Sequence, residues 1–429
     1  MSEQQIQKRF AAKNVTGWKA TIAVAMANYI EAGSIIAAAS SLTLWQAYLN
    51  IDSVGVGLLS ALSANALGAA IGALIGGPLT DKYGRKVIFS YDLVVYMLGI
   101  LFIVFAFNFP MLLIGTIITG VAVGAGVPVS WTYIAEESPD KERAKFVGSA
   151  QLAWSIGPAV TFALAVLVSP LGLLGSRLIF AHLFIIAGIA LYIRRGLPES
   201  KIWEERQKEK KIKQTEKKSL KELLKLKPNR EAIILLLGIY LFWNLTAGAT
   251  GYFMPYIYEN VGGLTNQQAN LLQSILWVFT VLTTYFIFMK LGDKVSRRLL
   301  FVIGGIAGTV GWIILTFFPM TWWTLIAFVF LWGSSAGIGA QAFYALWTSE
   351  LFSTDYRASA QGIMYFTVRT GIALWSLVLP TIMLTLGFKV AGTVMVVFLV
   401  IHVIIGFIMA PDTQGKSLKE IETERYGQI

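Results

Sequence analysis

A few charged side chains inside long apolar segments are the residues of this sequence most able to do chemistry. Glu31 lies about 13 residues into the first such segment, 18–44, and Arg369 lies about ten residues into the eleventh, 359–386. A charge at the centre of a bilayer costs about 3 kcal/mol or more, so each needs a partner or a function. Burial favours the neutral form of a carboxyl group. Glu31 can therefore carry a proton across, or it is a permanently protonated or paired structural group.

Arg369 has three possible roles, which the sequence leaves open. It can pair with Glu31, bind a carboxylate group on a substrate, or donate to backbone carbonyl groups.

Amide and aromatic side chains in the same apolar segments form a second group of candidates. Sugar hydroxyls need both hydrogen-bond donors and acceptors, which Asn and Gln supply, while flat rings cover C–H faces. Together with Arg369, the candidate substrate-binding residues are Asn28, Gln151, Trp154, Trp243, Asn244, Tyr252, Gln273, Trp277, Gln341 and Tyr344. Any one of these aromatic rings can instead face lipid or pack against a neighbouring helix.

Composition excludes several kinds of chemistry. The chain has no cysteine, and its two histidines, His182 and His402, both lie in apolar runs, so we expect no metal site. No catalytic constellation is evident, so we expect neither a cofactor nor enzyme activity. The formal net charge is +11, but residues 194–231 contribute +7 of it, with 14 Lys and Arg against 7 Glu. This local excess does not indicate nucleic-acid binding.

Membrane-spanning helices are the elements that must position these residues. The 429 residues are 56% hydrophobic and 14% charged, whereas a soluble domain carries roughly 25% charged residues. A helix needs about 20 mostly apolar residues to cross a bilayer. Because the apolar runs are continuous rather than alternating, the predicted fold is an all-α membrane protein with twelve transmembrane helices. The runs are 18–44, 54–79, 87–107, 111–135, 147–168, 174–193, 232–258, 271–290, 299–318, 322–351, 359–386 and 390–410.

The loops between these runs differ sharply in positive charge. Loops on one side carry many Lys and Arg and include the basic segment 194–231, whereas the opposite loops contain only Lys389. Loops rich in Lys and Arg stay in the cytoplasm. We therefore expect a multi-pass protein of the inner or plasma membrane with both termini in the cytoplasm.

The two halves of the chain repeat at one offset. Glu136 precedes Arg143 by seven residues, and Glu350 precedes Arg357 by seven. Each residue of the second pair lies 214 positions after its counterpart in the first. Charged hydrogen bonds at helix ends can clamp helices in one conformation and release them in another, although these residues can also be simple positive-inside anchors. The predicted gating residues are Asp81, Arg85, Glu136, Arg143, Asp293, Arg297, Glu350 and Arg357.

The repeat predicts a domain organisation. Residues 1–193 and 232–429 each form a six-helix bundle, and residues 194–231 form a cytoplasmic basic linker that contains an amphipathic helix. Parallel duplicated halves place a substrate site at their interface near the bilayer midplane, and rocking of the halves gives alternating access.

At residues 77–86 the pattern GxLxDxxGRK resembles the signature loop of the major facilitator superfamily. The repeated Glu/Arg pairs, Pro-Glu-Ser at 198–200 and the tail at 411–418 are similar to its sugar-porter branch. The resemblance covers essentially the whole chain, and in general likeness it extends to bacterial inositol transporters. It implies two pseudo-symmetric six-helix bundles and proton-coupled transport of a metabolite.

The resemblance also assigns positions. Glu31 is similar to an acidic residue of the first helix that takes part in proton coupling, but Thr116 stands where that residue's usual arginine partner is found. Gln151 and Gln273 match sugar-contacting glutamines in register. Residues 243–244 are Trp-Asn where the family has a pair of glutamines, so the resemblance does not imply a hexose-specific pocket.

These residues favour two functional hypotheses. The first is proton-coupled uptake of a sugar or polyol, inositol-like, by alternating access. The second is proton-coupled transport of a sugar acid or aromatic acid that uses Arg369. An uncoupled facilitator or a drug exporter would share the fold, and a membrane-embedded enzyme or sensor is the remaining class. The expected partners are a small-molecule substrate, the proton and the lipid bilayer, without nucleic acid. A monomer suffices because one chain holds both halves.

Overall fold

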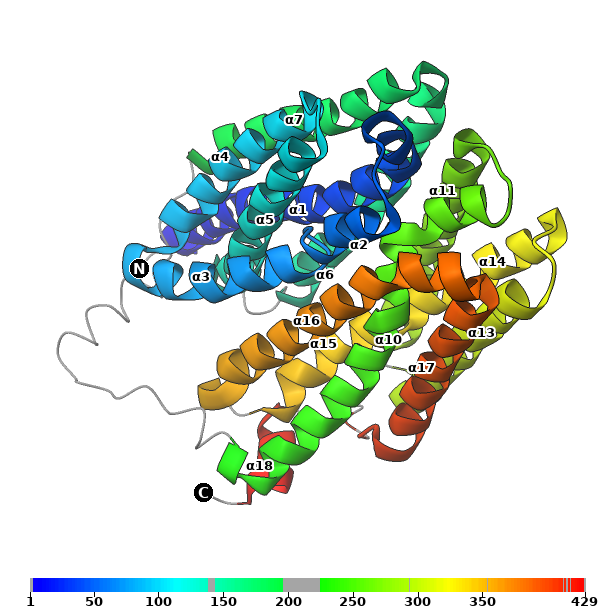
Figure 1. The fold of residues 1–429 in the computed structure, drawn as a ribbon. Coiled ribbons are helices and arrows are strands. Elements are labelled where there is room, and N and C mark those ends of the chain that lie inside the picture. The colour runs from blue at the N-terminus through cyan, green and yellow to red at the C-terminus, as the bar shows by residue number, and fades with distance from the viewer. Residues whose placement is uncertain are drawn as a thin grey trace. The chain divides into compact units, whose positions relative to one another are not determined.

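The computed structural model describes the backbone of residues 3–137, 143–195, 224–292, 294–352, 354–411, 413, 416 and 418–427. Side chains are described for most of these residues, but not for 3–21, 23–24, 77–78, 80–82, 85–86, 89, 127–151, 349, 353–359, 418–419 or 422. Every regular element in this part of the chain is a helix (Figure 1). Residues 196–223, which hold most of the predicted amphipathic helix of the linker, lie outside the described residues.

The described helices account for the predicted membrane spans. Nine helical stretches are long and apolar enough to cross a bilayer, two shorter apolar ones cover Leu67–Gly76 and Ser90–Val104, and α1 (Glu3–Leu49) supplies the first span. The predicted fold of twelve transmembrane helices is therefore confirmed. The nine stretches are Phe109–Gly126, Leu152–Leu171, Leu173–Arg195, Lys227–Asn260, Asn266–Leu291, Arg297–Phe317, Trp322–Thr348, Ala360–Leu386 and Phe388–Met409.

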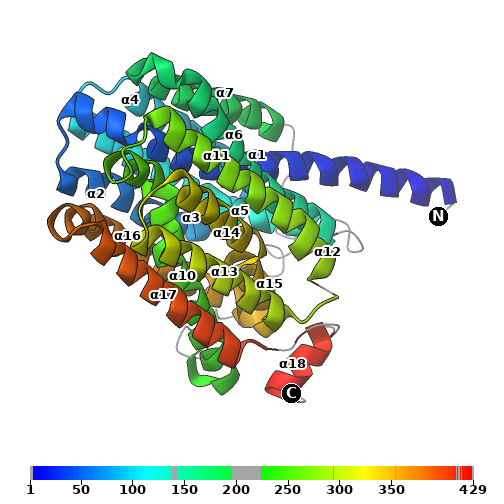
Figure 2. The ribbon, with the colours of Figure 1, turned by 90° about the vertical axis from the view of Figure 1, so that its right-hand side faces the viewer.

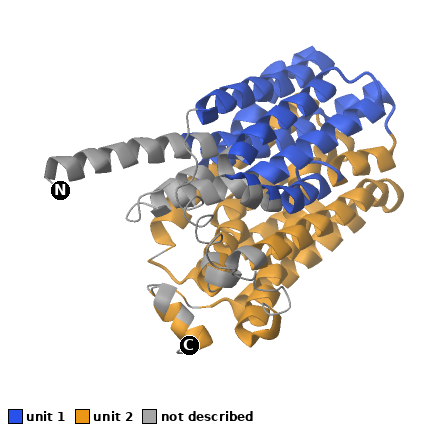
Figure 3. Cartoon of the chain, turned by 90° about the vertical axis from the view of Figure 1, so that its left-hand side faces the viewer, with its two compact units in different colours: residues 1–51, 62–215 blue, residues 52–61, 216–429 orange. Residues whose placement is uncertain are grey.

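One compact unit contains residues 1–51 and 62–215 and is called unit 1 here (Figure 3). Within it α1 packs against α5, α6 and α7, and α4 packs against α5 and α7. Besides α1, its helices are α3 (Leu67–Tyr83), α4 (Arg85–Val104), α5 (Phe109–Glu137), α6 (Arg143–Val168), the short η2 (Ser169–Leu171) and α7 (Leu173–Arg195).

Glycines let α3 and α5 approach closely. A Cβ atom on Gly72 would lie 2.1 Å from the carbonyl oxygen of Val121, and one on Gly124 would lie 2.1 Å from that of Ala69. Neither distance leaves room for any side chain. Small residues at such spacing bring helix backbones together inside membranes.

The second predicted span is not one continuous helix. α2 (Ser53–Ala61) and α3 are separated by residues 62–66, where Ser63 accepts bonds from the backbone N–H groups of Asn65 (3.1 Å, side chain) and Ala66 (3.2 Å, carbonyl). These local bonds replace the helical pattern. α2 itself packs against α16 (Thr354–Leu386), and a Cβ atom on Gly57 would lie 2.4 Å from the carbonyl oxygen of Leu377.

The second compact unit, unit 2, contains residues 52–61 and 216–429. α10 is its central helix, because it packs against α11, α15, α16 and α17 (Figures 1 and 2). Besides α2 and α16, the helices of this unit are α10 (Lys227–Asn260), α11 (Asn266–Thr283), η3 (Thr284–Phe288), α12 (Met289–Leu291), α13 (Arg297–Phe317), α14 (Trp322–Ile338), α15 (Ala340–Leu351), α17 (Phe388–Met409) and α18 (Leu418–Tyr426).

Local sequence explains two helix ends in this unit. α11 begins with a capping box, in which Thr265 and Gln268 each accept a bond from the other's backbone N–H group. The predicted tenth span is interrupted at Gly339, which has extended backbone angles and separates α14 from α15. Hydropathy alone gave no sign of this break, because the residues on both sides are apolar.

Candidate functional site

Glu31 and Asn28 lie on buried turns of α1 in unit 1. Glu31 is only 4% exposed and Asn28 is fully buried. The helix is tightly enclosed here, since a Cβ atom on Gly33 would lie 2.8 Å from the side chain of Leu183 on α7. The Glu31 carboxyl group is therefore inside the protein rather than on its surface.

The position at which the resemblance expects an arginine is a buried threonine on α5. The hydroxyl group of Thr116 donates to the carbonyl of Leu112 (2.9 Å), and that of Thr119 donates to the carbonyls of Gly115 (3.0 Å) and Thr116 (2.9 Å). Both hydroxyl groups bond within their own helix, so this part of α5 offers no cation to an acidic residue.

Both histidines are held by backbone carbonyls. His182 Nδ1 lies 2.6 Å from the carbonyl oxygen of Ile179, and its Nε2 lies 2.9 Å from the hydroxyl of Tyr29. Because a carbonyl only accepts, Nδ1 carries the hydrogen and Nε2 accepts from Tyr29. His402 Nδ1 lies 2.6 Å from the carbonyl of Ile239. The described residues include no cluster of three or more His, Cys, Asp or Glu that could hold a metal ion.

In unit 2, two predicted substrate-binding residues on α10 carry buried polar atoms that bond no residue in the described part of the chain. Trp243 Nε1 and the Tyr252 hydroxyl have no hydrogen bond to any described residue, and Tyr252 is fully buried. An unmade bond to a buried donor costs about 1–3 kcal/mol. Such atoms are expected where a polar ligand supplies the missing partner.

The predicted amide residues of this unit divide into two kinds. Gln273 is buried on α11 and donates from Nε2 to the hydroxyl of Tyr258 on α10 at 3.4 Å. Asn244 instead donates to the carbonyl of Tyr240 in its own helix at 2.9 Å. Gln341 on α15 is half-buried. Gln273 therefore links the two helices that carry most of this candidate site.

Aromatic rings near Trp243 form a continuous stack. The ring of Tyr344 stacks on Tyr240 with centroids 3.8 Å apart and planes 6° apart. Tyr240 stacks in turn on Trp243 at 6.3 Å, and Trp243 stacks on Trp332 at 6.4 Å. Sequence reasoning found Trp243 and Tyr344 but missed Tyr240, which lies three residues before Trp243 on the same helix face.

Arg369 lies on α16 with its guanidinium group over the ring of Tyr365, 4.9 Å from the centroid. This is a cation–π contact within one helix, four residues apart. Trp154 on α6 and Trp277 on α11 are half-buried. The Gln151 side chain lies outside the described residues.

A chain of polar side chains that sequence reasoning missed leads toward Gln273. Asn270 donates from Nδ2 to Asn266 Oδ1 at 2.9 Å, and Asn266 donates from Nδ2 to Glu259 Oε1 at 3.0 Å. Asn270 is fully buried, and its Oδ1 atom has no hydrogen bond to any described residue. The amides at 266, 270 and 273 share one face of α11, and that i, i+4, i+7 spacing was the signal available in the sequence.

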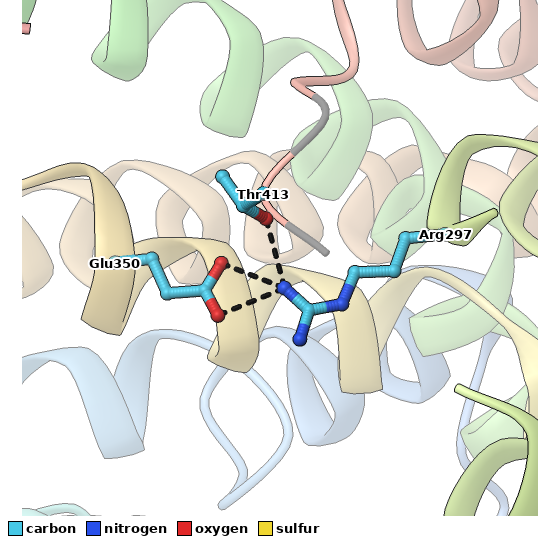
Figure 4. A network of polar contacts seen from close by, with 3 residues as sticks. All are labelled: Arg297, Glu350 and Thr413. Atoms are coloured by element: carbon cyan, nitrogen blue, oxygen red, sulfur yellow. Dashed lines mark hydrogen bonds and ion pairs between the residues drawn. The ribbon is translucent and has the colours of Figure 1, made fainter. Parts of the chain in front are cut away.

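Two predicted gating residues meet in unit 2. Arg297 Nη1 at the start of α13 lies 2.9 and 3.0 Å from the two carboxylate oxygens of Glu350 on α15, and it donates to the Thr413 hydroxyl at 2.8 Å (Figure 4). Arg298 also donates to the carbonyl of Ala410. The contacts tie two helix ends to the tail. The side chains of Asp81, Arg85, Glu136, Arg143 and Arg357, and all of Asp293, lie outside the described residues.

Many long apolar helices with buried polar side chains define a polytopic membrane protein, and comparison with known proteins gives its family. The chain belongs to the major facilitator superfamily, whose family model matches residues 20–277. The model of the family described as sugar (and other) transporters matches residues 204–424. The matched families consist of transporters, so the prediction that the chain is not an enzyme is confirmed.

Individual relatives agree with this assignment. The chain is 46% identical over 415 residues to the minor myo-inositol transporter IolF of Bacillus subtilis, which covers 95% of this chain and 94% of that protein. It is 28% identical over 408 residues to a probable polyol transporter 4 of Arabidopsis thaliana, covering 83% and 76%. A crystal structure of a D-xylose–proton symporter has the same fold, with a TM-score of 0.77, 19% identity, and coverage of 93% and 99%.

Proposed function

We propose that this protein is a secondary active transporter that takes up a sugar or polyol, with an inositol-like compound as the first candidate, together with protons. The observation that carries the substrate class is the set of buried polar atoms on α10 and α11. Trp243 Nε1, the Tyr252 hydroxyl and Asn270 Oδ1 lack hydrogen bonds within the described chain, and aromatic rings lie beside Trp243. Neutral donors and acceptors next to flat rings suit a compound with many hydroxyl groups. The likeness to IolF supports the same choice.

Most of the predicted residues have a place in this proposal. Glu31 takes the coupling proton inside unit 1. Trp243, Tyr252 and Gln273 bind hydroxyl groups from unit 2, with Trp277, Gln341 and Tyr344 beside them and Asn28, Gln151 and Trp154 completing the substrate contacts from unit 1. Arg297 and Glu350, with the other predicted charged residues at helix ends, act as gates. Residues 1–193 and 232–429 are the two moving halves, and 194–231 joins them in the cytoplasm.

A liposome experiment tests the function directly. Purified protein is reconstituted into proteoliposomes, and uptake of labelled myo-inositol is followed with and without a pH gradient that is alkaline inside. We expect uptake above equilibration only with the gradient, and competition by other inositols and sugars. Uptake that ignores the gradient would indicate an uncoupled facilitator. Absence of transport for every polyol and sugar would refute the proposal.

Arg369 supports a second candidate, transport of an organic anion. It is a half-buried cation in the middle of α16, where its retained charge requires a role. Competition by a sugar acid or aromatic acid that Arg369→Ala abolishes would favour this function. Failure of every such acid to compete would exclude it.

A further inference from the structure

Unit 1 contains a buried ion pair that the proposed function does not use. Asp92 on α4 and Arg194 in the last turn of α7 meet with Oδ1 and Nη1 3.0 Å apart, and their side chains are only 7% and 1% exposed. A buried pair is costly to form, and the loss of one partner leaves an uncompensated charge. Asp92 lies seven residues inside α4, about 10 Å from the end of the helix at 1.5 Å per residue.

The pair uses only one oxygen of the carboxylate. Asp92 Oδ1 accepts both from Arg194 Nη1 (3.0 Å) and from the backbone N–H of Leu93 (2.7 Å). Within the described chain Oδ2 accepts no hydrogen bond. It lies against Gly126 of α5, where a Cβ atom would be 1.6 Å from it. Glycine at position 126 is thus what lets this oxygen reach its place.

A small cavity adjoins the pair, with space for about one water molecule. Asp92, Arg194, Tyr96 and Gly126 line it, together with apolar residues of α1, α4 and α5. Of the described side chains, Arg194 from α7 and Tyr96 from α4 are the titratable groups that face Asp92, while α1 and α5 contribute Ala27, Ile30, Ala122 and Val123. The α3 side chains nearest the start of α4, at 80–82, lie outside the described residues.

We propose that the Asp92–Arg194 pair is a second proton-binding site of this transporter, with Oδ2 of Asp92 as the atom that takes the proton. A proton from water on Oδ2 converts the carboxylate to a neutral acid, and the charge of the pair changes from zero to +1. A guanidinium group that loses its carboxylate is unfavourable inside the bundle. Arg194 is in the last turn of α7, at the start of the linker. Its long, flexible side chain can turn outward and bring the guanidinium group into water.

The consequence is a change in how α7 is held. With Asp92 ionised, an ion pair holds Arg194 of α7 to α4; with Oδ2 protonated, that contact weakens to a hydrogen bond from Arg194 to a neutral acid at Oδ1. α7 also contacts α1 through His182 and Tyr29 (2.9 Å), and α1 lines the cavity with Ile30, the residue next to Glu31. The proton state of Asp92 is thereby transmitted to the helix that carries Glu31. Since Thr116 supplies no arginine to α1, this pair provides a buried carboxylate–guanidinium couple among the described residues of unit 1.

The inference rests on the proposed proton coupling, but infrared spectroscopy tests it without any substrate. Difference spectra of the purified full-length protein between acidic and neutral pH record the carbonyl stretch of carboxyl groups that take up protons. We expect Asp92→Asn to remove one component of this band and Glu31→Gln to remove a different one. Asp52→Asn is the matched control, because Asp52 is exposed and caps α2 through the N–H of Gly55. Spectra of Asp92→Asn identical to those of the control would overturn the inference.

Transport assays then distinguish a role of Asp92 in proton coupling from a role in the fold. In proteoliposomes, Asp92→Asn should lose accumulation driven by a pH gradient, while counterflow stays within about twofold of the wild-type rate. Because Asp92→Asn removes the carboxylate that faces Arg194, the neutral double variant Asp92→Asn/Arg194→Gln checks the fold, and it should show the same split. Loss of counterflow in a well-folded double variant, or normal accumulation in Asp92→Asn, would refute the inference. A wild type that transports no polyol would refute the proposed function, while the infrared result would still decide the proton site.

Discussion

Tyr252 and Tyr258 lie six residues apart on α10 and provide a matched pair of substitutions. Both side chains are fully buried. The Tyr252 hydroxyl has no hydrogen bond within the described chain, whereas the Tyr258 hydroxyl accepts from Gln273 Nε2 at 3.4 Å. Replacing either residue with phenylalanine removes one oxygen atom and nothing else, so any difference between the variants comes from the hydroxyl's partner.

The two variants should change stability in opposite directions. A buried polar group without a partner costs about 1–3 kcal/mol, so Tyr252→Phe should raise the unfolding temperature of the substrate-free protein. Tyr258→Phe should lower it, because the Gln273 amide loses its acceptor. If the substrate bonds the Tyr252 hydroxyl, that substitution removes about 0.5–1.5 kcal/mol of binding, or roughly a 2- to 13-fold rise in KM.

The assay combines thermal unfolding of the detergent-solubilised protein with initial rates of myo-inositol uptake in proteoliposomes. A higher unfolding temperature with a higher KM for Tyr252→Phe would place this hydroxyl in the substrate site. A lower unfolding temperature with an unchanged KM would refute the reasoning, since the hydroxyl would then serve the fold alone.

Further substitutions test the remaining roles. Glu31→Gln should lose accumulation driven by a pH gradient but keep counterflow; equal gradient-driven uptake would remove Glu31 from coupling. Arg369→Ala should leave uptake of a neutral polyol nearly unchanged and abolish competition by organic acids if the anion candidate is correct, which competition assays measure. Gly124→Val should destabilise unit 1 strongly, because its Cβ atom meets a backbone carbonyl at 2.1 Å, and the yield of folded protein reports this. Arg297→Ala should lower the free energy of unfolding by about 3–5 kcal/mol by leaving Glu350 without its cation, and Arg297→Lys should recover part of the loss in thermal unfolding.

Hydropathy predicted the spans because a bilayer imposes one simple requirement. Every backbone polar group must be satisfied within the helix, so the spans appear as long apolar runs. The same requirement does not reveal a break in a helix where other hydrogen bonds within the chain satisfy the backbone. The turn at 62–66 depends on Ser63 and Asn65. The interruption at Gly339 depends on the extended backbone angles of that residue. Both lie inside apolar sequence that reads as uninterrupted helix.

Pairings between distant residues were harder to predict than residue types. The repeat identified Arg297 and Glu350 as charged residues at helix ends, but not that they bond each other across 53 positions. Asp92 and Arg194 are separated by 102 positions, and no periodicity connects them. In α11, by contrast, the spacing of Asn266, Asn270 and Gln273 is enough by itself to put all three on one face of a helix.

The buried acids Glu31 and Asp92 and the polar atoms of α10 and α11 that lack partners lie in different units, and this separation bears on how coupling can work. The deeply buried acids Glu31 and Asp92 belong to unit 1, whereas the polar atoms on α10 and α11 that lack partners, such as those of Trp243 and Tyr252, belong to unit 2 and are neutral. A ligand shifts a conformational equilibrium only through its different affinity for the two states. In the proposed mechanism, the proton changes charge at buried acids of unit 1, and the polyol fills the open hydrogen bonds on α10 and α11 of unit 2. Coupling then requires no direct contact between proton site and substrate, only a conformational change that alters both sets of interactions together.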